Sequence, residues 1–185
     1  MTEQPRATAG ERNTSDLDYW SFVELARDRL NEEFPDNDAT ATKVILTLNR
    51  AASLVTYDLE STIHRPRGWS WSAFRMMFVL WLAGPMEPNV AAKLTGMSRA
   101  AVSNLSNTLI AKELLRKDAS EGDKRAVTLS LTPKGLQEIR DAFSEHNSRE
   151  SRWAAVLTEV EQELLVMLLE KLMSKRGEVG AKDRH

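Results

Sequence analysis

The sequence predicts a mainly helical chain that contains one short β-hairpin. Apolar residues recur at steps of three and four over most of its 185 residues, which is the period of an amphipathic helix. Capping residues, prolines and glycines divide these stretches into separate helices. One stretch, residues 126–131, alternates apolar and polar side chains as a half-buried strand does. No apolar run approaches the roughly 20 residues that a membrane-spanning helix needs.

Two helices are expected near the N-terminus. Ser15 and Asp18 have the spacing of a capping box and open the first helix, which Pro35 ends. The second helix is expected over residues 39–64 and carries a near-heptad apolar stripe. The stripe consists of Val44, Leu48, Ala51, Val55, Leu59 and Ile63. Because a stripe of this length on a small chain needs a partner, we expect it to take part in dimerisation.

Three shorter helices follow the second one. Ser70 is expected to cap the first of them, which ends before Gly84. A short helix over residues 88–94 leads into a tight turn at Gly96, and Ser98 caps the next helix, which reaches residue 112. The segment therefore has the order helix, glycine turn and capped helix.

A hairpin and two more helices complete the chain. Strands are expected over residues 114–118 and 126–131, with a polar loop between them. Thr132 caps a helix that has Pro133 at its first position, and a capping box at Thr158 opens the last helix, which is rich in leucine. The expected parts are flexible tails at 1–14 and 177–185, dimerisation helices at 15–66 and 136–176, and a DNA-binding domain at 67–135.

The order of elements in residues 67–135 is that of a winged helix-turn-helix domain, here flanked by dimerisation helices. Its second capped helix meets the requirements of a recognition helix, because Val102 and Leu105 point inward while short polar side chains remain outside. Asn104 could bond adenine through both atoms of its amide, and Arg99 could reach guanine or phosphate. The candidate DNA-contacting residues of this helix are Ser98, Arg99, Ala100, Ser103, Asn104 and Asn107.

The hairpin adds basic residues to the same segment. Lys124 and Arg125 occupy its loop, where a basic side chain can enter the minor groove, and Asp123 is placed to aim the arginine. The whole chain has a net charge of −2, yet residues 93–140 carry nine Lys and Arg against five Asp and Glu. A local basic surface of this kind is typical of DNA-binding proteins.

The stretch from residue 68 to residue 136 resembles the winged-helix domain of the MarR family of transcriptional regulators. The most specific match covers residues 123–135, which read Asp-x-Arg, a strand, and then Leu-Thr-x-x-Gly. Ser98 and Arg99 at the start of the recognition helix also fit. The resemblance implies a homodimer, double-stranded DNA as partner, and a minor-groove role for Arg125.

The resemblance also implies a small anionic or aromatic effector, which in this family often binds between the dimerisation helices and the DNA-binding lobe. An arginine and a tryptophan there could hold an aromatic carboxylate by charge pairing and stacking. The alternative is that the tryptophans belong to the core and that Arg75 pairs with a carboxylate of its own fold. The candidate effector residues are His64, Arg65, Trp69, Trp71 and Arg75.

Other classes of function lack sequence support. The chain has no cysteine, and its three histidines have no ligand-spaced neighbours, so neither thiol chemistry nor a metal site is expected. No nucleotide-binding or hydrolase motif is present, which predicts a protein without catalytic residues or cofactor. The N-terminus does not resemble a secretory signal, so a cytoplasmic location is expected. An effector-independent DNA-binding protein and a protein-binding winged helix remain as alternatives.

Overall fold

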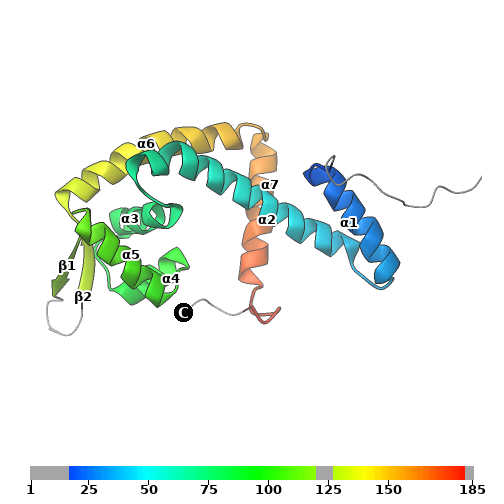
Figure 1. The fold of residues 1–185 in the computed structure, drawn as a ribbon, viewed down its shortest axis with the longest axis horizontal. Coiled ribbons are helices and arrows are strands. Elements are labelled where there is room, and N and C mark those ends of the chain that lie inside the picture. Colours follow the sequence, from blue (N-terminus) through cyan, green and yellow to red (C-terminus); the bar gives the residue numbers. More distant parts are fainter. Residues whose placement is uncertain (1–16, 120–126, 182–185) are drawn as a thin grey trace, which may run out of the picture. The chain divides into compact units, whose positions relative to one another are not determined.

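The computed structural model describes residues 17–119 and 127–181 and is mainly helical with one two-stranded hairpin, as the sequence predicts (Figure 1). The contacts within the chain divide it after Leu54 into two compact units. The first unit contains α1 (Tyr19–Glu33) and the greater part of α2 (Ala39–Leu59). Among the described helices, none has both the length and the apolar character to cross a membrane.

The start of α1 differs from the prediction, because the capping residue is Asp18. The Asp18 carboxylate accepts from the backbone N–H of Ser21 at 2.8 Å, and the Ser21 hydroxyl accepts from the backbone N–H of Asp18 at 2.9 Å. Ser15 lies outside the described residues. Both Ser15 to Asp18 and Asp18 to Ser21 have the spacing of a capping box, and the carboxylate adds a favourable charge at the helix N-terminus.

The second predicted helix does not keep α-helical geometry to its end. It changes after Leu59 into a π-helical turn, η2 (Glu60–His64), and then a 3₁₀ turn, η3 (Arg65–Arg67). A π-helical turn holds more residues than an α-helical one. Ile63 and His64, which both lie in this turn, are buried.

The second unit contains the winged helix-turn-helix and the C-terminal helices. In Figure 1, α3 lies between α6 on one side and α4 with α5 on the other. The strands are antiparallel, with Leu115 opposite Leu131 and Ala119 opposite Val127, and each begins one residue later than predicted. The elements of this unit are α3 (Trp71–Ala83), α4 (Pro88–Thr95), α5 (Arg99–Ala111), β1 (Leu115–Ala119), β2 (Val127–Leu131), α6 (Pro133–Ala154) and α7 (Glu159–Ser174).

Four of the predicted helix starts are confirmed by their side-chain hydrogen bonds. In each, the capping oxygen accepts from the backbone N–H three residues further on, which satisfies one of the free donors at a helix start. The confirmed capping residues are Ser70, Ser98, Thr132 and Thr158.

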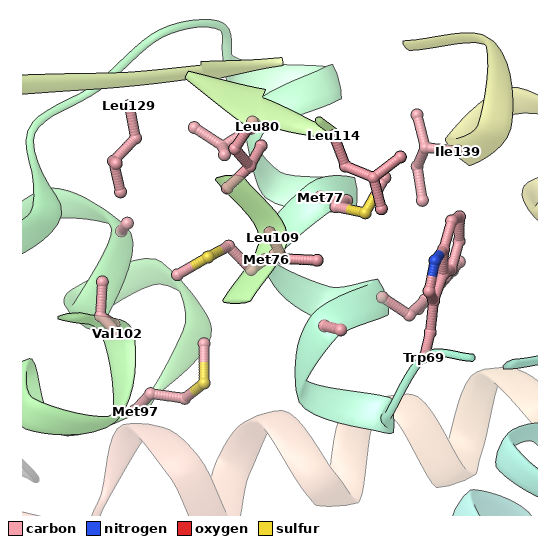
Figure 2. Packing of buried hydrophobic residues seen from close by; sticks show 14 of the residues in the cluster. Trp69, Met76, Met77, Leu80, Met97, Val102, Leu109, Leu114, Leu129 and Ile139 are labelled. Carbon is pink, nitrogen blue, oxygen red and sulfur yellow. The ribbon is translucent and has the colours of Figure 1, made fainter. Parts of the chain in front are cut away.

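The core of the second unit is built around α3 (Figure 2). Met76 and Met77 are completely buried at its centre, and Leu109 packs against them from α5. The hairpin contributes Leu129 of β2 to this cluster, and the C-terminal part of the chain contributes Ile139 of α6. Burying one such side chain contributes about 1.5–3 kcal/mol to the stability of the fold. The cluster therefore holds α5 and the hairpin in fixed positions against α3.

Backbone contacts fix the base of the hairpin. The N–H of Thr132 donates to the carbonyl of Leu114 at 3.1 Å, and the Thr132 hydroxyl donates to the carbonyl of Glu113 at 2.6 Å. A Cβ atom on Gly135 would lie only 2.0 Å from the carbonyl oxygen of Leu114, so that only glycine fits there. The N–H of Leu129 donates to the carbonyl of Met86 at 2.8 Å, which ties β2 to the connection between α3 and α4.

Candidate nucleic-acid interface

Helix α5 has one buried and one exposed face. Val102 and Leu109 are buried as an inward face requires, and Leu105 packs against the core while partly exposed. Ser106 is also buried, and its hydroxyl donates to the carbonyl of Val102 at 2.6 Å, so no polar group is left unpaired there. The exposed face carries the predicted DNA-contacting residues Ser98, Arg99, Ala100, Ser103, Asn104 and Asn107.

The exposed face begins at a helix N-terminus that favours anions. The Ser98 hydroxyl accepts from the backbone N–H of Ala101 at 3.2 Å, which leaves other N–H groups of the first turn free. Arg99 adds a positive charge at this end, and no acidic residue lies in the first turn. Free N–H groups and the helix dipole both attract phosphate oxygens.

One contact joins α5 to the hairpin. The ammonium group of Lys117 in β1 donates to Oδ1 of Asn107 at 2.8 Å. Sequence reasoning missed this pair, because the periodicity of a helix and of a strand gives no information about contacts between them. The contact places a basic side chain of the hairpin beside the exposed face of α5.

The hairpin carries a hydrogen-bonded group on its two strands. The Ser130 hydroxyl donates to Oδ2 of Asp118 at 2.8 Å, and Nε of Arg116 donates to the same oxygen at 2.9 Å. These bonds, that of Ser130 first, lower the pKa of Asp118 below its ordinary value. The predicted wing residues Asp123, Lys124 and Arg125 belong to the segment between the strands and lie outside the described residues.

A cavity of about 470 Å³ lies in the second unit among α3, α4 and α6. Two predicted effector residues, Trp71 and Arg75, line it. Arg75 forms no ion pair with any carboxylate of the described residues, so the alternative partner within its own fold is not found there. The lining comprises Trp71, Phe74, Arg75, Phe78, Val79, Leu94, Thr95, Phe143, His146 and Glu150.

The other three predicted effector residues do not line this cavity. Trp69 is buried in the core cluster, as the alternative interpretation of the tryptophans holds. Arg65 is exposed, with Nε 3.3 Å from a Glu60 carboxylate oxygen and its guanidinium over the ring of Tyr57. His64 is completely buried behind the lining, where it contacts the cavity-lining residues Phe74 and His146.

That second histidine, His146, was not a predicted site residue. Its Nδ1 lies 3.2 Å from Nε2 of His64, and its Nε2 lies 3.0 Å from a carboxylate oxygen of Glu150. An ionised carboxylate only accepts, so we assign the proton of His146 to Nε2 and its lone pair to Nδ1, which accepts from His64. Nδ1 of His64 then has no partner among the described residues.

Aromatic rings enclose the histidine pair. Phe74 stacks on both imidazoles, at centroid distances of 4.4 Å from His64 and 4.3 Å from His146. Burial lowers the pKa of His64 to about 4, with the charges of His146 and Arg67 as smaller causes. Burial also lowers the pKa of His146, although Glu150 acts in the opposite direction. Both imidazoles are therefore neutral at neutral pH.

The comparisons with known proteins agree with this geometry. The MarR family model matches residues 69–127. The HTH-type transcriptional regulator YwaE of Bacillus subtilis is 33% identical over 132 residues, which cover 71% of this chain and 77% of the relative.

Two solved structures share the fold. The MarR family regulator AbsC of Streptomyces coelicolor matches with a TM-score of 0.66 and 23% identity, covering 80% of this chain and 97% of AbsC. Bordetella bronchiseptica BpsR, whose DNA binding is regulated by 6-hydroxynicotinic acid, matches with a TM-score of 0.65 and 23% identity, covering 71% of this chain and 98% of BpsR. The chain belongs to the MarR family of transcriptional regulators, and its winged helix-turn-helix is that of a DNA-binding protein.

Proposed function

We propose that the protein is a homodimeric repressor that binds a pseudo-palindromic operator in the cytoplasm and leaves it when a hydroxylated aromatic acid binds. The observation that carries the proposal is the exposed face of α5, which combines short polar side chains with an anion-attracting N-terminus. Such a face fits the major groove and has little to offer an apolar protein surface. It therefore supports DNA as the partner over a protein-binding winged helix.

The wing is the first part of the proposal to test. We expect Arg125→Ala to weaken operator binding by about 1–3 kcal/mol with little change in thermal stability, because the arginine would lie in the minor groove. Operator duplexes selected from a random pool should be titrated at several salt concentrations. Wild-type affinity should fall steeply with salt as counterions are released.

Arg152→Ala is the matched control for the wing. Arg152 is exposed in the last turn of α6, so its replacement removes one positive charge from outside the winged helix. We expect this variant to bind as wild type does. Equal affinity of Arg125→Ala and wild type would contradict the assignment of Arg125, and the absence of binding to every duplex would contradict the proposed function itself.

Homodimerisation is inferred from apolar surface that the single chain leaves open. No residue of α7 is buried. In the first unit, Val44 and Ile45 of α2 are about half exposed, at 48% and 50%. Apolar surface of this extent is rare on monomers and is typical of an interface. The large exposed hydrophobic residues of α7 are Val160, Leu164, Leu165, Val166, Met167, Leu168, Leu172 and Met173.

We expect light scattering at micromolar concentration to give twice the 20.9 kDa mass of one chain. Leu168→Glu should shift the equilibrium toward monomer, since it places a charge on the apolar face of α7. Glu163→Gln, an exposed change on the same helix, should leave the mass unchanged. A monomeric wild-type protein would contradict the homodimer.

The effector is inferred from the chemistry of the cavity among α3, α4 and α6. Aromatic rings would stack on a planar ligand, the unpaired guanidinium of Arg75 would hold its carboxylate, and Glu150 would accept a hydrogen bond from its hydroxyl. The cavity also contacts Thr95, the last residue of α4 before the Gly96 turn into α5. A ligand there would press on the turn that positions the recognition helix. The regulation of BpsR by 6-hydroxynicotinic acid supports this class of effector.

We expect 6-hydroxynicotinic acid to raise the melting temperature and to weaken operator binding. At a hundredfold excess over the dissociation constant, a ligand that binds only the folded state adds about 2.7 kcal/mol of stability. Arg75→Gln should abolish both effects. Arg65→Gln is the control, because Arg65 does not line the cavity and its guanidinium contacts Glu60 and Tyr57. An unchanged response of Arg75→Gln would contradict this binding mode, and no response of wild type to any hydroxylated aromatic acid would favour an effector-independent DNA-binding protein.

A further inference from the structure

The contact between Lys117 and Asn107 determines which way the asparagine amide faces. An ammonium group has three donors and no acceptor, so only the amide oxygen of Asn107 can meet it. Nζ of Lys117 lies 2.8 Å from Oδ1 of Asn107. The amide nitrogen is therefore directed away from the lysine. In this arrangement Asn107 turns its hydrogen-bond donors away from the lysine. One of the two lone pairs of Oδ1 is occupied, and the ammonium charge beside that oxygen disfavours the approach of a further N–H donor.

Asn104 lies about one turn earlier on the same exposed face and differs in this respect. Its side chain forms no hydrogen bond with the rest of the described chain, and the hydroxyl of Thr108 donates to its backbone carbonyl instead. Its amide keeps both a donor and an acceptor for DNA. Bidentate recognition of adenine requires both groups at once, whereas guanine O6 and N7, thymine O4 and phosphate oxygens only accept.

We propose that Lys117 is a positioning residue that orients Asn107 so that its amide nitrogen meets acceptor groups of DNA, while Asn104 keeps both groups of its amide available for adenine. The inference rests on the proposed DNA-binding function and adds to it a rule for two neighbouring asparagines. In the free protein the Lys117–Asn107 contact is exposed to water and worth little. Docking on DNA removes that water, and a hydrogen bond to an ammonium group is stronger in the drier interface.

Lys117 is also suited to this role by its position on the hairpin. It lies opposite Leu129, which is completely buried in the core, so the strand that carries it is held in place. Only one of its three N–H donors is used by Asn107. The remaining donors can reach a phosphate without releasing the asparagine.

The test compares operators selected from a random duplex pool by wild type, Lys117→Met and Lys117→Arg. Wild type should prefer guanine, which presents two acceptors in the major groove, over adenine, which presents one acceptor and one donor, by about five- to tenfold at one position of each half-site. Lys117→Met should reduce that preference to about twofold or less, because the amide can then turn over. Lys117→Arg retains a donor without an acceptor and should restore it.

A double-mutant cycle separates a base acceptor from a phosphate acceptor. If Asn107 bonds phosphate, Asn107→Ala weakens all sequences equally, and its effect and that of Lys117→Met are still non-additive on one operator. Lys93→Met is the control, since Lys93 is exposed on α4 and its side chain forms no hydrogen bond or ion pair within residues 17–119 or 127–181. Its effect should add to that of Asn107→Ala.

Two results would overturn the inference in different ways. Additive effects of Lys117→Met and Asn107→Ala, together with unchanged base preferences, would show that Lys117 does not position Asn107, while DNA binding itself stands. Failure of wild type to bind any selected duplex at low salt would remove the proposed function and the positioning role together. Melting temperatures close to wild type are expected for all variants, because every substituted residue is exposed.

Discussion

Gly135→Ala is expected to lower the free energy of unfolding by about 3 kcal/mol or more, because the new methyl group has no space. Its Cβ would lie 2.0 Å from the carbonyl oxygen and 2.9 Å from the carbonyl carbon of Leu114. Both are backbone atoms, so no side-chain rotation relieves the clash. Replacing glycine by alanine within a helix normally stabilises it by about 1 kcal/mol, and the expected sign is therefore the reverse of the usual one.

Urea unfolding at fixed protein concentration measures this effect. Gly177→Ala is the matched control, since a Cβ at Gly177 meets no atom within 4 Å, and its stability should equal that of wild type. Stability of Gly135→Ala equal to that of wild type would contradict the close approach of α6 to the hairpin.

Mild acid is expected to destabilise the protein through the buried histidine pair. Burial holds the pKa of His64 at about 4 in the folded state, against 6.5 for an unburied imidazole. Above about pH 6.5 both states are neutral and the stability is fully present. As the pH falls toward 4, His64 becomes protonated in the unfolded chain but stays neutral in the folded one. From pH 7 to pH 5 the free energy of unfolding should fall by about 2 kcal/mol through His64.

Urea unfolding of wild type and His64→Phe at pH 7 and pH 5 tests this dependence. From pH 7 to pH 5 the free energy of unfolding of the variant should fall by about 2 kcal/mol less than that of wild type, because one titrating imidazole is missing. This holds even if the variant is less stable at pH 7 because Nδ1 of His146 lacks its donor. His185→Gln, which changes the histidine at the C-terminal residue, should keep the full dependence. If wild type and His64→Phe lost the same free energy of unfolding between pH 7 and pH 5, the buried neutral histidine pair would be contradicted.

The contact of Asp58 with Arg149 and Trp153 is also sensitive to acid, but it is lost only at a lower pH than the one at which the histidines are tested. Asp58 accepts from Nε of Arg149 and from Nε1 of Trp153, both at 2.7 Å. The hydrogen bonds of Arg149 and then of Trp153 lower the pKa of Asp58 to about 2. For a carboxyl with a lowered pKa, stability is present above about pH 4 and is lost as the pH falls through the folded value. Measurements between pH 7 and pH 5 therefore report the histidines.

Local signals in the sequence predicted most element boundaries. A hydroxyl at the first residue of a helix forms its hydrogen bond three residues away, so Ser70, Ser98 and Thr158 could be recognised without knowledge of the tertiary structure. The same local rule failed where two overlapping patterns competed, at Ser15 and Asp18. The π-helical turn that buries His64 was also missed, because it depends on packing that the helical period does not encode.

The candidate sites were predictable only as far as one element determines them. The exposed and buried faces of α5 follow from its own period, and both were predicted correctly at Val102 and Asn104. The cavity and the histidine pair depend on contacts between distant segments, since His64 and His146 are 82 residues apart. Proximity in sequence suggested Arg65 and Trp69 for the effector site, but Arg65 is exposed and Trp69 is buried in the core, because proximity along the chain does not fix where a side chain points.

The base of the hairpin is held mainly by main-chain groups. The paired strands, the carbonyls of Glu113 and Leu114, and the missing Cβ of Gly135 depend little on the side chains that the loop beyond them carries. We therefore expect that the segment between Ala119 and Val127 can be replaced by the loop of another winged-helix regulator without changes to the strands or to α6. Chimaeras of this kind would test the proposed minor-groove contact of the wing while α5 stays the same.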